Sequence, residues 1–83
     1  DRSMRIPAAA ALLTLALAAP AAAQTISAEE AIAIAREAGM VEVRDVELDD
    51  GREWEIEGRD AQGRKIEVDI DARTGAVIKV ERD

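Results

Sequence analysis

The chain has 83 residues and a formal net charge of −7, and it contains neither cysteine nor histidine. This length suits one small domain, and the composition excludes disulfides, thiol chemistry and histidine-based catalysis or metal binding. The acidic balance disfavours nucleic acid and anionic membrane surfaces as partners, because negatively charged side chains repel phosphate groups.

Residues 1–23 have the order of parts that is typical of a cleavable secretory signal peptide. They contain a short positive start, an apolar stretch rich in Ala and Leu, a helix-breaking proline and a small-residue cleavage site: Arg5, residues 8–19, Pro20 and Ala21–Ala23. Asp1–Ser3 precede Met4 and are interpreted as added residues or an upstream extension. A retained membrane anchor is the alternative, but the apolar stretch is short for a span of about 20 residues.

We expect cleavage after Ala23, which makes Gln24 the new N-terminus and leaves residues 24–83 as the mature domain. This part carries nine Lys and Arg against seventeen Asp and Glu, a formal net charge of −8. The signal predicts a periplasmic or secreted protein with no stable membrane insertion after cleavage.

The first element of the mature domain is predicted to be a helix that begins at Ser27 and ends at Gly39. Ser27 and Glu30 have the S-x-x-E spacing of a capping box. Gly39 suits the left-handed position that follows a helix. Four small side chains recur on one face and let the helix lie close to a sheet: Ala28, Ala31, Ala35 and Ala38.

After Gly39 the apolar period changes from 3.6 to 2, which predicts four strands. They are expected over residues 41–48, 53–57, 65–71 and 76–81, separated by turns at Asp50–Gly51, 60–63 and 72–75. In the first strand Val41 and Val43 share one parity and Val46 and Leu48 the other, so we expect a bulge at Arg44–Asp45. In the last strand Ala76, Ile78 and Val80 are expected on the apolar face, and Val77 on the opposite one.

The fold class is therefore predicted to be α+β, with one N-terminal helix packed across a four-stranded antiparallel meander sheet in two layers. Trp54 has the same parity as Ile56, which places its side chain towards the helix. The other face of the sheet is expected to be charged and open to solvent.

Three parts of the mature region resemble the PepSY domain family. They are the capped helix of residues 26–39, the acidic hairpin that follows it, and above all the ending of residues 63–81, whose hairpin over residues 68–77 reads VDIDARTGAV. The resemblance covers nearly all of residues 25–82. It implies an exported or membrane-associated module of the kind found in propeptides of secreted metallopeptidases and in small stand-alone periplasmic proteins, with no catalytic residues and no cofactor.

Our leading hypothesis is a non-enzymatic protein-binding module that modulates a peptidase in trans, through a strand edge or through the open face. The candidate partner-binding residues on the open face are Glu55, Glu57, Glu67 and Asp69. An exposed, flat carboxylate face is not the concave, partly dry site that acid–base catalysis requires.

The alternative hypothesis is a calcium- or small-ligand-binding sensor of the cell envelope. Carboxylates near the turns offer oxygen ligands of the type that Ca²⁺ prefers: Asp49, Asp50, Asp69 and Asp71. The segment around Asp69 and Asp71 lacks the closing Glu of an EF-hand loop, so the competing interpretation is a hairpin in which Asp caps its own turn.

Overall fold

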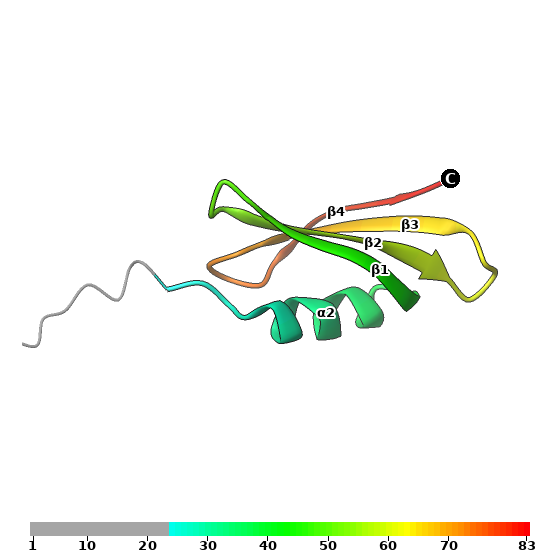
Figure 1. Cartoon of the computed structure of the whole chain (residues 1–83), viewed down its shortest axis with the longest axis horizontal. Coiled ribbons are helices and arrows are strands. Elements are labelled where there is room, and N and C mark those ends of the chain that lie inside the picture. Colours follow the sequence, from blue (N-terminus) through cyan, green and yellow to red (C-terminus); the bar gives the residue numbers. More distant parts are fainter. Residues whose placement is uncertain (1–23) are drawn as a thin grey trace, which may run out of the picture.

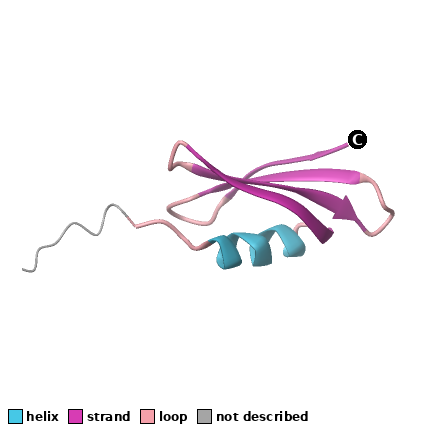
Figure 2. Ribbon diagram, in the orientation of Figure 1, coloured by secondary structure: helices cyan, strands magenta, loops and turns pink. Residues whose placement is uncertain are grey.

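A computed structural model describes residues 24–83; the predicted signal peptide and its cleavage site lie outside these residues. The described elements are α2 (Ala28–Glu37), β1 (Met40–Asp49), β2 (Glu53–Asp60), β3 (Lys65–Asp71) and β4 (Val77–Arg82). All four strands form one antiparallel sheet in the order β1-β2-β3-β4, and α2 lies along one face of it (Figures 1 and 2). The predicted α+β class and meander topology are confirmed.

The helix α2 begins and ends as its sequence predicts. The Ser27 hydroxyl accepts the Glu30 amide at 3.1 Å, and the Glu30 carboxylate accepts the Ser27 amide at 2.8 Å. These two bonds satisfy donors that a helix start leaves free. Gly39 follows the helix at φ 118°, a value that favours glycine. No helix among residues 24–83 is long and apolar enough to cross a bilayer.

Each hairpin turn has local chemistry that fixes it. Asp50 and Gly51 have positive φ values of 57° and 69°, which match the right-handed twist of the strands that they join. In the next turn the Asp60 carboxylate accepts the amides of Gln62 and Arg64, both at 2.9 Å. The turns therefore set the strand register that positions the side chains of the sheet.

The core lies between α2 and the face of the sheet that it covers. Its fully buried members are the small helix residues and the apolar side chains of the strands: Ala31, Ala35, Met40, Ile56, Ile66, Val68 and Ile70. The two alanines let the helix approach the sheet closely, as the small-residue stripe predicts. The helix packs mainly against β1 and β2, so it leaves the β4 side of the sheet less covered.

Trp54 is half-buried against this core, on the side predicted from its parity with Ile56. Its indole Nε1 donates to the Ile26 carbonyl at 3.1 Å. The Ile26 amide donates in turn to the Ala72 carbonyl at 2.7 Å. Ile26 is thus held on both sides just before the helix begins.

The register of β1 differs from the expectation in one respect. It has two irregularities, one at Val41 and one at the predicted position, Arg44. The first turns Val41 outwards, where it is 56% exposed, and places Met40 in the core instead. The prediction that Val41 shares a face with Val43 is therefore wrong, because a bulge reverses the alternation.

The register of β4 also shifts by one residue. Val77 lies opposite the buried Ile70, and Val80 lies opposite Val68, with the extra residue between them. The placement of Val77 on the polar face is therefore wrong, because the shift breaks the period of two. Val77, Ile78 and Val80 are all exposed, at 46%, 51% and 39%.

Candidate functional site

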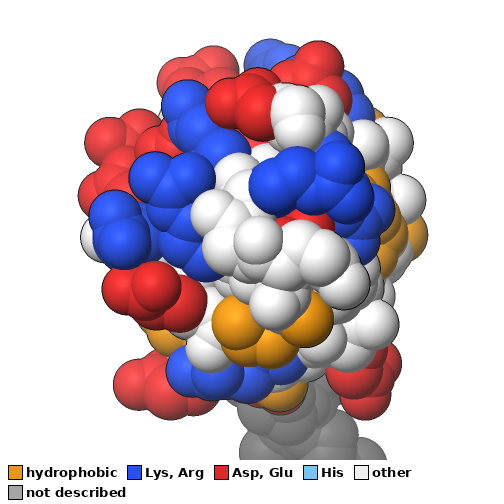
Figure 3. Space-filling view, turned by 90° about the vertical axis from the view of Figure 1, so that its right-hand side faces the viewer, with side chains coloured by type: hydrophobic (Ala, Val, Ile, Leu, Met, Phe, Trp, Pro, Cys, Tyr) orange, Lys and Arg blue, Asp and Glu red, His pale blue; other side chains and the backbone are white. Residues whose placement is uncertain are grey.

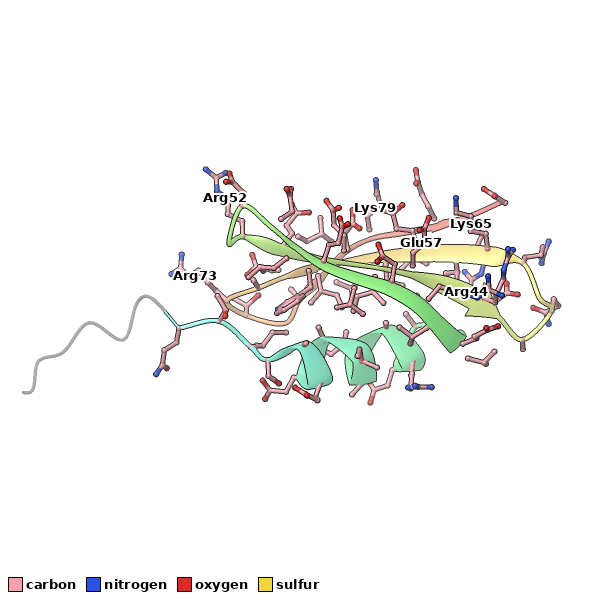
Figure 4. All side chains as sticks on the ribbon, in the orientation of Figure 1. Arg44, Arg52, Glu57, Lys65, Arg73 and Lys79 are labelled. Atoms are coloured by element: carbon pink, nitrogen blue, oxygen red, sulfur yellow. The ribbon has the colours of Figure 1, made fainter. Side chains whose placement is uncertain are left out.

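The face of the sheet that points away from α2, called the open face below, carries rows of charged side chains. One cross-strand row runs from β1 to β4 as Glu47, Glu55, Asp69 and Lys79. The next row is formed by Asp45, Glu57, Glu67 and Glu81. Figure 4 shows Glu57, Lys65 and Lys79 on this side of the ribbon. The strand period of two gathers these side chains on a single face.

The structure brings the four predicted partner-binding residues together in the two central strands. Glu55 on β2 lies opposite Asp69 on β3, and Glu57 lies opposite Glu67. Beside them is a hollow of about 230 Å³ that is lined by acidic side chains alone: Asp45, Glu47, Glu55, Glu57 and Glu67. Such a surface attracts cations and basic segments of other proteins.

Two carboxyl groups in these rows have a raised pKa, Glu55 first through desolvation and Glu67 first through a hydrogen bond to Asp69. Partial desolvation raises the pKa of Glu55, and the negative charges of Asp49 and Asp69 raise it further. The pKa of Glu67 is raised first by a hydrogen bond that its protonated form donates to Asp69, and then by burial. In both groups the charges of neighbouring carboxylates add to the rise in pKa.

Asp69 occupies the most enclosed position on this face, with 6% of its surface exposed. Lys79 Nζ lies 3.6 Å from Asp69 Oδ2 and 3.8 Å from Glu81 Oε1, so one ammonium is divided between two carboxylates. The other oxygen, Asp69 Oδ1, is buried and accepts no hydrogen bond from the described residues.

One group of carboxylates is close enough to hold a metal ion. It consists of Glu53, Glu55 and Asp69, whose oxygens lie within 4.8 Å of one another. Sequence reasoning considered Asp69 for calcium but did not consider Glu53 and Glu55 as part of the same candidate group. The parity of β2 predicts that Glu53 and Glu55 share one face, but their proximity to Asp69 follows only from the pairing of β2 with β3.

Asp71 has a different role from the one that the calcium hypothesis gives it. Its carboxylate accepts the amides of Arg73 at 2.8 Å and Thr74 at 3.0 Å, which holds its pKa below the usual range. Asp71 thus caps its own turn, as the competing interpretation predicts. It lies outside the metal-ligand group, as do Asp49 and Asp50.

The charge changes sign at the end of the open face near the second hairpin. Arg44, Arg59 and Lys65 line a hollow of about 180 Å³ there, together with Glu57 and Gly58. Lys65 Nζ lies 3.1 Å from Glu57, and Arg44 Nε lies 2.9 Å from Glu42. The end-on view shows Lys and Arg side chains gathered beside acidic ones (Figure 3). The open face is therefore acidic along its centre and carries a group of basic side chains at this end.

The sheet has two edges that differ in regularity. At one edge β1 carries two bulges, which disturb the row of backbone groups that faces outwards. At the other edge β4 has one shift, and its last four residues pair regularly with β3. Of the two, β4 is the better template for another strand, and its apolar side chains are exposed.

The chain is similar to a known protein family. A family model described as "Peptidase propeptide and YPEB domain" matches residues 5–81. A search of curated proteins and a search of solved structures each gave no match.

Proposed function

The chain belongs to the PepSY family of peptidase propeptide and YPEB domains, and we propose that it is a non-catalytic module that binds another protein, with a peptidase as partner. PepSY domains are typically non-catalytic and generally extracytoplasmic. The family description links the domain to peptidases, and the proposed action is binding in trans, in the periplasm or outside the cell.

The single observation that carries the proposed binding mode is the exposed β4 edge. Its backbone groups face outwards at the end of the sheet, and its exposed apolar side chains, Val77 and Ile78, offer contacts beside them. An extended segment that adds to such an edge gains main-chain hydrogen bonds, while side-chain contacts give selectivity.

The acidic rows of the open face support the same proposal through charge. Long-range attraction raises association rates with a basic partner, and its effect weakens as salt is added. Glu55, Glu57, Glu67 and Asp69 are the proposed steering and contact residues, since they line the centre of this face. Lys79 is a residue of β4 in the same row as Asp69, so it lies beside both the open face and the β4 edge.

Affinity capture from envelope extract tests the proposal. The baits are the native mature chain, an Ile78→Lys variant on β4 and a Val41→Lys variant on β1. Val41 is the matched control, because it is as exposed and apolar as Ile78 but lies on the opposite edge. We expect the native and Val41→Lys baits to retain a shared partner and the Ile78→Lys bait to lose it, since a charge on a strand edge opposes strand addition.

A fourth bait separates the edge from the open face. In it the four acidic residues of the central strands, Glu55, Glu57, Glu67 and Asp69, are changed to Lys. Steering by this face is supported if this bait captures less of the partner than the native bait does, and if added salt also lowers capture by the native bait. A recovered peptidase is then assayed with and without the native chain. If no bait retains a specific partner, the proposed function is refuted.

A further inference from the structure

Asp69 has one buried oxygen, Oδ1, that accepts no hydrogen bond when its neighbour Glu67 is ionised. Its side chain is 9% exposed, and Oδ1 accepts no hydrogen bond from residues 24–83. A buried carboxylate oxygen without a donor or a cation is unfavourable, because burial removes its hydration. The neighbouring Lys79 is on the side of Oδ2, at 3.6 Å, and it is shared with Glu81.

Two further carboxylates point into the same region from β2. Glu53 and Glu55 each place an oxygen within 4.8 Å of the others and of Asp69. Glu55 lies directly opposite Asp69, and Glu53 lies two residue pairs further along β2, opposite Asp71. The carboxylates of Glu53, Glu55 and Asp69 thus meet on the open face.

We propose that Glu53, Glu55 and Asp69 bind a Ca²⁺ ion on the open face of the sheet. Ca²⁺ takes oxygen ligands at about 2.3–2.6 Å, so oxygens on opposite sides of the ion stand about 5 Å apart, and the observed spacing lies within that limit. Mg²⁺ requires shorter distances and near-octahedral geometry, which a spread group of three side chains satisfies less well.

The electrostatics of the face favour the same cation. The rows around the site contain more carboxylates, including Glu47 and Glu67, which add attraction without further ligand contacts. The ligands are half-exposed at Glu53 and Glu55, so water completes the coordination. A site with few protein ligands belongs in the affinity range of extracellular calcium modules, with Kd of about 10⁻⁴–10⁻³ M.

This inference does not depend on the proposed function, because cation binding is measured on the purified chain without any partner. The experiment is a titration of the ¹⁵N-labelled chain with CaCl₂ to about 10 mM, which exceeds the expected Kd tenfold. Parallel titrations use MgCl₂ and, at matched ionic strength, KCl. Amide chemical shifts report both the affinity and the position of the ion.

Three variants sharpen the result. Glu53→Gln removes a half-exposed ligand, and Asp69→Asn removes the buried one. Glu37→Gln is the matched control, since it deletes the same charge from an exposed position on α2, across the sheet from the site. Because Asp69→Asn alters a buried position, Glu53→Gln gives an independent test if the former variant fails to fold.

We expect saturable Ca²⁺-dependent shifts centred on β2 and β3, weakened about tenfold or more in Glu53→Gln and Asp69→Asn and unchanged in Glu37→Gln. Shifts that do not saturate, or that KCl reproduces, would overturn the proposal. So would unchanged affinity in Glu53→Gln, or tighter binding of Mg²⁺ than of Ca²⁺.

Discussion

Replacing Trp54 by phenylalanine tests whether the Trp54 indole anchors the segment that precedes α2. The indole Nε1 donates to the Ile26 carbonyl at 3.1 Å, and Ile26 is bound on its other side to Ala72. Phenylalanine keeps an aromatic ring against the core but removes this donor. Loss of one neutral hydrogen bond lowers the free energy of unfolding by about 0.5–1.5 kcal/mol.

The smaller ring of phenylalanine adds to this loss. It buries less apolar surface than indole, which removes roughly another 0.5–1 kcal/mol at 25 cal/mol per Å². We therefore expect Trp54→Phe to lower the free energy of unfolding by about 1–2.5 kcal/mol, and Tm by about 4–8 °C for each kcal/mol. Urea unfolding followed by circular dichroism measures the change, since the variant has lost the one tryptophan of the chain.

Amide hydrogen exchange distinguishes the anchoring hydrogen bond of Trp54 from the packing of its ring in the core. In the native chain the Ile26 amide is protected by the Ala72 carbonyl. In Trp54→Phe we expect this amide to lose more protection than the amide of Ile56 in the centre of β2, because residues 24–27 open locally. If both amides lose the same protection, Trp54 acts only through the core, and the anchoring role is refuted.

Three more predictions concern the scaffold. Replacing Ser27 by alanine removes the hydroxyl acceptor of the capping box, and we expect the free energy of unfolding in urea to fall by about 1 kcal/mol; an unchanged midpoint contradicts the capping role. Replacing Gly58 by alanine drives a methyl group against the Glu42 carbonyl of β1. We therefore expect the free energy of unfolding to fall by an amount at the upper end of about 1–3 kcal/mol; a native-like thermal transition contradicts this steric clash. In Asp60→Asn we expect lower stability than the native chain at neutral pH. The amide of Arg64, above all, holds the pKa of Asp60 low in the folded state, so its stabilising effect is present above the pKa of the unfolded chain and is lost as the pH falls through the folded value. The difference from the native chain should therefore narrow below about pH 4, and a difference that does not depend on pH refutes this account.

The sequence predicted those features that depend on local spacing. The capping box, the glycine after the helix and the three turns are each determined by a few adjacent residues, and all of them are confirmed. The period of two also placed Glu55, Glu57, Glu67 and Asp69 on one face, and the structure has them there.

Features that depend on register shifts were not predictable in the same way. A bulge reverses the alternation of side chains without leaving a clear mark in the sequence. For this reason the structure has Met40 rather than Val41 in the core, and Val77 opposite Ile70. The position of α2 over β1 and β2 is set by packing, and it explains why Val80 stays exposed although it pairs with a buried residue.

The candidate metal ligands show the same limit. Asp71 was selected with Asp69 because the two are close in sequence, but its turn amides already occupy its carboxylate. Glu53 was overlooked because its proximity to Asp69 arises only from the pairing of β2 with β3. Cross-strand neighbours become visible once the register is known.

The most direct test of the central claim, that this PepSY domain binds another protein through β4, is site-specific photo-cross-linking in the cell envelope. A photoreactive amino acid replaces Ile78 on β4, Val41 on β1 or Glu37 on α2 in separate chains. The account predicts one discrete adduct from position 78 and much weaker adducts from positions 41 and 37. Equal adducts from all three positions, or none from position 78, would contradict it.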